Sequence, residues 1–217
     1  MTDVPVQIDP TDATDGPDDG PDWPAFYRST IGREPRPLFV RGMAVATAAG
    51  RLPGQAIEIG FGDGTETLAL LTRGWQVLAI DPTPAAAEGL RSLVPAEQVD
   101  RIEVVTAGGE AATLRPFDLL YAGYALPFIH PTRFEAFWAG VRSALRPGGV
   151  LIVNLFGDRD SWVGDPGMTF VDRARVDALV DGLDLLDLAE EEADGEAFSG
   201  PKHWHVFDIV ARRPASS

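Results

Sequence analysis

Three glycines alternate with other residues in the segment Glu58-Ile59-Gly60-Phe61-Gly62-Asp63-Gly64-Thr65. The segment follows a short apolar run, residues 56–59, and precedes residues 65–73, whose apolar positions have helical spacing. Glycine permits tight turns and lets a ligand approach the backbone closely. Ligands of open α/β sheets bind at the carboxyl ends of the strands, where such a loop would lie. The segment therefore predicts a ligand-binding loop between a strand and a helix.

Asp81 is an acidic residue that could bind the same ligand as the loop. It ends the next apolar run, residues 76–80, and is followed by Pro82. An acid at the end of the second strand can accept hydrogen bonds from both hydroxyls of a ribose. The 21 residues from Gly60 to Asp81 are the spacing of one strand–helix–strand unit. A nucleoside-containing cofactor is the predicted ligand.

Two cofactor classes compete for this loop. A dinucleotide site requires Gly-x-Gly-x-x-Gly/Ala, and here Thr65 stands at the third small position after Gly60 and Gly62. The pattern acid-x-Gly-x-Gly-x-Gly is instead complete, from Glu58 to Gly64. A nicotinamide-dependent oxidoreductase is therefore the less favoured reading. A non-catalytic protein that only binds the cofactor stays open, because the motif reports binding and not turnover.

The complete pattern resembles motif I of class I S-adenosylmethionine-dependent methyltransferases. Residues 55–155 resemble that fold family further in Gly109-Glu110-Ala111, in the fourth predicted strand from Phe117 to Tyr124, and in the turn Leu145-Arg-Pro-Gly-Gly149. The resemblance implies S-adenosylmethionine as the cofactor. It places the glycine loop around the methionine and ribose parts, Asp81 on the ribose, and Glu110 with Ala111 at the adenine.

A narrower resemblance covers the two ends of the chain. Residues 23–80 and the segment Gly200-Pro-Lys-His203-Trp204-His205 are similar to the tellurite-resistance-type branch of bacterial methyltransferases. Members of that branch act on small molecules or metalloid oxyanions, so a small-molecule acceptor is implied. The implied cofactor-binding residues are Glu58, Gly60, Phe61, Gly62, Asp63, Gly64, Thr65, Asp81, Pro82, Glu110, Ala111, Ala122 and Tyr27.

Methyl transfer is an in-line displacement, which needs an aligned nucleophile and the exclusion of water. A base is needed only when the acceptor arrives protonated. His130 and Tyr124 follow the fourth predicted strand near the reacting end and are the catalytic candidates, with no assignment between them. The predicted acceptor-binding residues are Tyr124, Phe128, Trp162 and His203.

Several charged or aromatic residues have two interpretations. Trp162 lies in a glycine-rich loop and is either a lid residue or an anchor of that loop. Arg33 or Arg36 either pairs with a carboxylate of the cofactor or acceptor, or is solvated. Two histidines at period two on the last strand could ligate a metal, but no third ligand and no cysteine accompanies them, so no metal site is predicted.

Alternating strands and helices predict an α/β fold with a seven-stranded, mostly parallel, Rossmann-like sheet, helices on both faces and an antiparallel last strand. The expected strands are residues 56–59, 76–80, 101–106, 117–121, 150–155, 183–188 and 204–211, with a polar loop before the last. The expected helices are residues 65–73, 84–93, 132–145 and 172–180. Residues 23–217 form one predicted domain, in which residues 23–54 are a helical cap.

The formal net charge of −15 disfavours binding to nucleic acid or to an anionic membrane. Residues 1–22 carry seven Asp and no Lys or Arg, which predicts a disordered acidic tail. The chain has no cysteine, no apolar run long enough to span a membrane and no signal peptide. A bacterial, cytoplasmic monomer or homodimer is the expectation.

Overall fold

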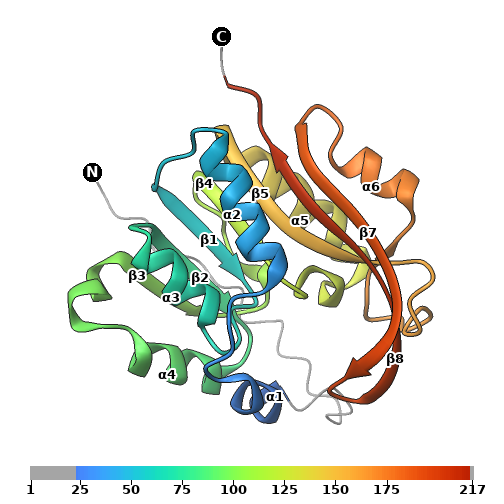
Figure 1. The fold of residues 1–217 in the computed structure, drawn as a ribbon, viewed down its shortest axis with the longest axis horizontal. Helices are drawn as coiled ribbons and strands as arrows, with labels where there is room; N and C mark the ends of the chain where they lie inside the picture. The colour runs from blue at the N-terminus through green and yellow to red at the C-terminus, as the bar shows by residue number, and fades with distance from the viewer. Residues whose placement is uncertain (1–22, 216–217) are drawn as a thin grey trace.

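A computed structural model describes residues 23–215, so the predicted acidic tail, residues 1–22, lies outside the described residues. The fold is one twisted sheet with the strand order β3-β2-β1-β4-β5-β8-β7, and the short β6 pairs with β5 (Figure 1). The strands are β1 (Gln55–Ile59), β2 (Gln76–Asp81), β3 (Ile102–Thr106), β4 (Phe117–Ala122), β5 (Leu145–Gly157), β6 (Phe170–Val171), β7 (Asp184–Ala197) and β8 (Gly200–Arg212).

The five strands β1 to β5 pair in parallel, whereas β8 runs antiparallel to both β5 and β7. The predicted mostly parallel α/β fold with an antiparallel last strand is therefore confirmed. The two-residue β6 is an eighth strand that the sequence did not predict. The α-helices are α1 (Trp23–Thr30), α2 (Pro37–Ala48), α3 (Thr65–Thr72), α4 (Pro84–Leu93), α5 (Pro131–Ala144) and α6 (Arg173–Leu179), and short 3₁₀ turns are η2 (Ala96–Arg101), η3 (Gly109–Ala111) and η4 (Leu126–Phe128).

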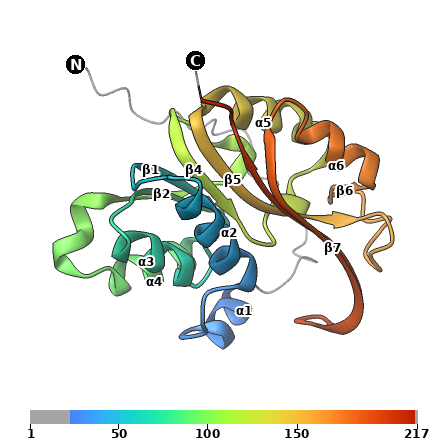
Figure 2. The same cartoon turned by 45° about the horizontal axis from the view of Figure 1, so that its top comes forward.

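Helices cover both faces of the sheet, as Figure 2 shows. One core cluster joins α2, α3 and α4 to one face, and the other joins α5 and α6 to the opposite face. Side chains alternate between the faces along each strand. In β4, for example, Leu120 contributes to the α5 side and Leu119 and Tyr121 to the α2 side. Strands buried on both faces explain the apolar runs in the sequence.

Proline begins three of these helices, at Pro37, Pro84 and Pro131. Proline suits the first turn because its fixed φ matches the helix and its missing N–H has no partner there. The helix predicted at residues 84–93 has the same bounds in the structure. The longest described helix, α5, has 14 residues, and none within residues 23–215 is long and apolar enough to cross a membrane.

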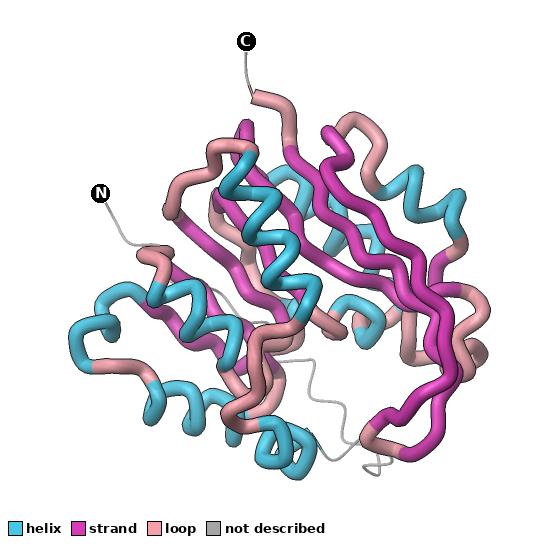
Figure 3. Tube along the Cα trace, in the orientation of Figure 1, coloured by secondary structure: helices cyan, strands magenta, loops and turns pink. Residues whose placement is uncertain are grey.

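The C-terminal hairpin corrects the predicted polar loop before the last strand. Its two strands pair continuously from Asp184 opposite Arg212 to Ala197 opposite Gly200. Glu190, Glu191 and Glu192 place acidic side chains on both faces of the strand. This stretch therefore lacks the apolar alternation that predicts a strand. The outer part of the hairpin extends beyond the other strands and bends towards α1 (Figure 3).

The fifth strand also begins earlier than predicted. Residues 146–149 were expected to form the turn that precedes it, but β5 starts at Leu145. The register between β4 and β5 shifts between Phe117 and Leu119, where the side chain of Asp118 accepts a hydrogen bond from Arg146 Nη1 at 2.9 Å. The turn-forming residues are therefore accommodated as an irregular start of the strand.

Gly42 marks the closest approach of α2 to the sheet, and its substitution tests that packing. A Cβ added there would lie 2.5 Å from Cγ2 of the buried Ile152, whereas one at the exposed Gly89 of α4 meets nothing within 4 Å. Gly42→Ala should lower the free energy of unfolding by about 1–3 kcal/mol through overpacking. Gly89→Ala should raise it by about 0.5–1 kcal/mol through helix propensity. Urea unfolding checks both, and equal changes would contradict the packing argument.

Candidate functional site

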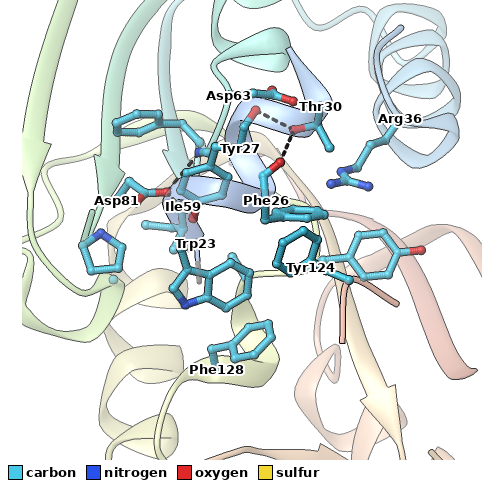
Figure 4. A pocket seen from close by; sticks show the side chains of 18 of the residues that line it. Trp23, Phe26, Tyr27, Thr30, Arg36, Ile59, Asp63, Asp81, Tyr124 and Phe128 are labelled. Atoms are coloured by element: carbon cyan, nitrogen blue, oxygen red, sulfur yellow. Dashed lines mark hydrogen bonds between the residues drawn. The ribbon is translucent and has the colours of Figure 1, made fainter. Parts of the chain in front are cut away.

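A pocket of about 860 Å³ opens at the carboxyl ends of the parallel strands. The glycine loop and the end of β2 form one side, and α1 lies over it, as Figure 4 shows. The other side is formed by Tyr121, residues 123–125, Phe128 and the tip of the β7–β8 hairpin, residues 196–199. The pocket is thus at the place where the fold predicts a ligand.

The three glycines of the loop all have a left-handed backbone conformation. Their φ values are +72° at Gly60, +55° at Gly62 and +79° at Gly64. Side chains are disfavoured there, and a Cβ at Gly60 would lie 2.5 Å from the Cβ of Ala125. The sequence pattern therefore follows from the shape of the loop, which exposes backbone to the pocket at Gly60 and Gly62.

Asp81 is buried at the end of β2 and joins several segments. Its Oδ2 accepts hydrogen bonds from the Gly62 N–H at 3.0 Å and from the Tyr27 hydroxyl at 3.3 Å. Its Oδ1 accepts one from the Thr83 N–H at 2.9 Å. Burial raises the pKa of Asp81, and these hydrogen bonds oppose that shift. Tyr27, which the resemblance implied as a cofactor-binding residue, thus donates a hydrogen bond to the predicted ribose acid.

Glu58 lies beneath the loop and not on the pocket surface. Its Oε2 accepts a hydrogen bond from the Thr67 hydroxyl of α3. Burial raises the pKa of Glu58 well above its usual value, and the nearby Glu66 adds to this. Glu58 therefore supports the loop from behind. Of the other predicted cofactor residues, Gly64, Thr65, Ala111 and Ala122 also lie outside the lining, whereas Gly60, Phe61, Gly62, Asp63, Asp81, Pro82, Glu110 and Tyr27 line it.

Arg33 fastens the segment after α1 to the glycine loop. Its Nε lies 2.8 Å from Asp63 Oδ2, and its Nη1 and Nη2 each lie 2.6 Å from an oxygen of Glu66. Both carboxylates are almost fully buried. Sequence reasoning missed Glu66, which sits in the first turn of α3, where an acid is favoured by the helix dipole. Arg33 is neutralised by this pairing.

The chain leaves β4 through a strained residue. Tyr124 has a φ of +59°, the one such value outside glycine in the described chain. Its N–H donates to Asn154 Oδ1 at 2.7 Å, which holds this conformation in place. The Arg36 guanidinium lies 5.0 Å from the Tyr124 ring centroid. Backbone strain of this kind concentrates at functional sites.

Aromatic rings line the half of the pocket beyond Tyr124. Phe128 contacts Trp23 of α1, with centroids 4.9 Å apart, and Trp162, with centroids 6.3 Å apart. Trp204 lies 5.8 Å from Tyr124 and 6.0 Å from Trp162. The predicted acceptor residues Tyr124, Phe128 and Trp162 are therefore brought together in one wall. Sequence reasoning missed Trp23, Phe26, Phe156, Phe198 and Trp204, which also line the pocket.

The single lysine of the chain is buried behind this wall. The side chain of Lys202 is fully buried and forms an ion pair with the equally buried Asp160. Its Nζ lies 3.7 Å from the Trp162 ring centroid and 4.5 Å from that of Trp204. Asp160 Oδ1 also accepts from the Trp162 N–H at 3.0 Å. The pair thus anchors the Trp162 loop to β8, in favour of the anchoring interpretation.

The histidines lie outside the pocket lining, which corrects two predictions. His130 is exposed and caps α5, where its Nδ1 accepts a hydrogen bond from the Thr132 N–H at 3.2 Å. His203 is partly exposed and pairs with Asp194 and Glu192 across the hairpin. Neither residue therefore lines the pocket, although their chain neighbours Ile129 and Trp204 do. Among residues 23–215 no group of three acidic or histidine side chains is arranged to hold a metal ion.

Comparison with known proteins finds a match to one family and to several methyltransferases. Residues 56–149 match the family described as "Methyltransferase domain". The match spans less than half of the chain, and together with the fold it supports the resemblance to class I S-adenosylmethionine-dependent methyltransferases seen in the sequence.

Individual relatives share the fold at low identity. TehB of Haemophilus influenzae is 16% identical, with a TM-score of 0.63 over 79% of this chain and 62% of that chain. The N-methyltransferase NodS of Bradyrhizobium japonicum WM9, in complex with S-adenosyl-L-homocysteine, is 15% identical, with a TM-score of 0.64 over 89% of this chain and all of that chain.

Two curated proteins are also similar in sequence. The carboxy-S-adenosyl-L-methionine synthase of Pseudomonas putida is 24% identical over 181 residues, which are 78% of this chain and 72% of that protein. Hemagglutinin 1 of Eikenella corrodens is 29% identical over 110 residues, and the chain spans only 36% of its length.

Replacement of Arg33 tests how much its ion pairs with Asp63 and Glu66 stabilise the fold. Arg33→Met leaves the buried Glu66 and Asp63 without their counter-charge, so the free energy of unfolding should fall by about 3 kcal/mol. Arg173→Met breaks the exposed pair with Asp177 and should cost no more than about 0.5 kcal/mol. Urea unfolding of both variants provides the measurement, and similar losses would refute the structural role of Arg33.

The titration of Asp63 gives a pH-dependent test. Burial alone raises the pKa of Asp63, but the Thr65 N–H at 3.0 Å and the Arg33 charge outweigh burial and lower it. A lowered pKa in the folded state stabilises the fold above the unfolded value of 3.8. The stability difference between the wild type and Asp63→Asn should therefore be constant from about pH 7 to pH 5 and shrink as the pH falls below the unfolded pKa. A difference that grows with acidity would contradict this.

Proposed function

We propose that the protein transfers a methyl group from S-adenosylmethionine to a small-molecule acceptor. The arrangement of the left-handed glycine loop against Asp81, at the mouth of the pocket, carries this proposal. S-adenosylmethionine is the cofactor of this class, and NodS was solved with its product bound.

The residues present fit this cofactor. The Gly60 and Gly62 backbone offers the close approach that a side chain would fill. Asp81 is positioned to accept hydrogen bonds from ribose hydroxyls, once Tyr27 Oη shares or leaves Oδ2. Glu110 lines the same pocket after β3, where the family receives the adenine amino group. When bound, the cofactor supplies a sulfonium methyl group that is already activated for displacement.

The chain's own residues then orient the acceptor and exclude water. α1 covers the glycine loop through Tyr27, and the hairpin tip meets α1 where Phe198 lies 5.5 Å from Phe26. Aromatic side chains surround the end of β4 around Tyr124. Apolar walls around the reacting atoms favour displacement because they reduce competing water.

The same loop supports two alternative functions less well. A nicotinamide cofactor would need a small residue at position 65, where α3 begins with a threonine. A protein that only binds the cofactor would have the same loop but would release no methylated product. The cytoplasmic location, the bacterial source and a monomeric or dimeric state are further proposals, and none of them bears on the chemistry.

Titration with S-adenosylhomocysteine tests the cofactor site. Asp81→Asn should weaken binding by about 1–3 kcal/mol, or roughly 5-fold to 150-fold in Kd, since a charged acceptor of hydrogen bonds is lost. Calorimetry on the purified full chain gives the value. Asp177→Asn, which changes an exposed acid of α6, serves as the matched control and should bind like the wild type.

Either of two results would overturn the cofactor proposal. One is wild-type protein that is folded by circular dichroism and binds NAD(H) but not S-adenosylhomocysteine. The other is an Asp81→Asn variant whose affinity equals that of the wild type.

A further inference from the structure

The acceptor half of the pocket is built mainly from aromatic faces. Phe156 of β5 is fully buried at its base, with centroids 5.7 Å from Trp204 and 6.0 Å from Trp162. Phe128 and Trp23 continue the wall across to α1. Rings from separate elements prefer offset or edge-to-face contact with a flat π system. The shape and surface of this chamber therefore suit a planar aromatic compound.

The charge of the pocket disfavours an anion. Five carboxyl groups line it, from Asp63, Glu66, Asp81, Glu110 and Glu196, against two guanidinium groups. One of the two, that of Arg33, is neutralised within its own ion-pair network. Arg36, which packs on Tyr124, is the one remaining cation of the described lining. An oxyanion would therefore enter against a net negative field.

The hydroxyl of Tyr124 does not act as a base. Burial raises the pKa of Tyr124, so its phenol keeps its proton at neutral pH. Burial likewise raises the pKa of Tyr27 and of Tyr121. His130 and His203, the other candidates for proton transfer, lie outside the lining.

The carboxylates of the pocket are occupied or distant from this end. Asp63 and Glu66 are held by Arg33, and Asp81 by three hydrogen bonds. Glu110 lies on η3, beside the β3 end of the sheet. Glu196 is exposed on the hairpin tip. A general base must lie within hydrogen-bond reach of the proton that it removes. Glu66, which also accepts a hydrogen bond from the Arg36 N–H, is already paired, and Glu110 and Glu196 lie on η3 and on the hairpin tip.

We infer that the acceptor is a planar heteroaromatic compound whose nucleophilic ring nitrogen carries no proton at neutral pH. This inference rests on the proposed function and specifies its substrate class. The nitrogen lone pair attacks the methyl carbon, and the carbon–sulfur bond breaks with its electron pair left on sulfur. The products are an N-methylated cation and S-adenosylhomocysteine, so charge balances and no proton has to be removed. An aliphatic amine, which is protonated at neutral pH, lacks this lone pair.

Matched probes test the inference on the full chain saturated with S-adenosylhomocysteine. Calorimetry compares isoquinoline and quinoxaline with 1,2,3,4-tetrahydroisoquinoline, a protonated amine of the same size, and with tellurite. The heteroaromatic probes should bind at least tenfold more tightly than tellurite. Tetrahydroisoquinoline carries a positive charge that the acidic pocket attracts, so it is compared by its rate of methylation, which should be at least tenfold lower because its nitrogen lone pair holds a proton. With S-adenosylmethionine present, mass spectrometry should show N-methylisoquinolinium and S-adenosylhomocysteine in equal amounts.

Wall variants locate the probe. Trp162→Leu and Phe128→Leu should each weaken isoquinoline binding by about threefold to tenfold and leave the affinity for S-adenosylhomocysteine unchanged. Val99→Ala, at an exposed residue of η2, should change neither. Two wall variants are used because Trp162 also packs on Lys202 and its loss could disturb the loop.

Three outcomes overturn the inference. They are faster methylation of tetrahydroisoquinoline than of isoquinoline, tighter binding of tellurite than of isoquinoline, and no binding of either heteroaromatic probe to protein that binds S-adenosylhomocysteine. In all three cases the proposed function stands, because the cofactor site is intact. Failure to bind S-adenosylhomocysteine itself would instead remove the proposed function.

Discussion

The carboxylate of Asp81 connects three segments that are far apart in the chain. It ends β2, accepts a hydrogen bond from the glycine loop after β1, and accepts another from Tyr27 of α1. A buried carboxylate with such partners fixes their relative positions, because each donor would be left unpaired if it moved away. The loop in turn presents Asp63 to Arg33, which anchors the chain just after α1. The part of the pocket formed by the glycine loop, the end of β2 and α1 therefore depends on the carboxylate of Asp81.

The β7–β8 hairpin brings the C-terminal part of the chain to the N-terminal helix. Its outer part has no neighbour in the sheet beyond β7 and β8 themselves, yet its tip contacts α1 through Phe198 and Phe26. The hairpin carries Trp204 into the aromatic wall and Glu196 to the rim. One element thus contributes both to the aromatic wall of the chamber and to the acidic side chains at its rim.

Local patterns in the sequence predicted that the glycine loop and Asp81 lie together, and the structure shows that they do. The glycines of the loop and Asp81 could be predicted because their backbone geometry requires particular residue types at fixed spacing. The aromatic wall could be predicted only in part, since Trp23, Phe156 and Trp204 meet through tertiary contacts that no local spacing encodes. Only the outer part of the hairpin was missed, because its residues are mostly polar and it was predicted as a loop. His130 and His203 were expected at the pocket because strand ends alone do not fix the direction of a side chain.

The burial of Lys202 has a practical consequence for the study of this chamber. The chain contains no other lysine, and the aromatic rings and Asp160 shield its amine from solvent. An amine-directed acylating reagent can modify this side chain only when the ring cluster opens. The rate of acylation at this one residue, read by peptide mass, therefore measures how often the wall opens. Lys202 thus reports the opening of the aromatic wall without any added label.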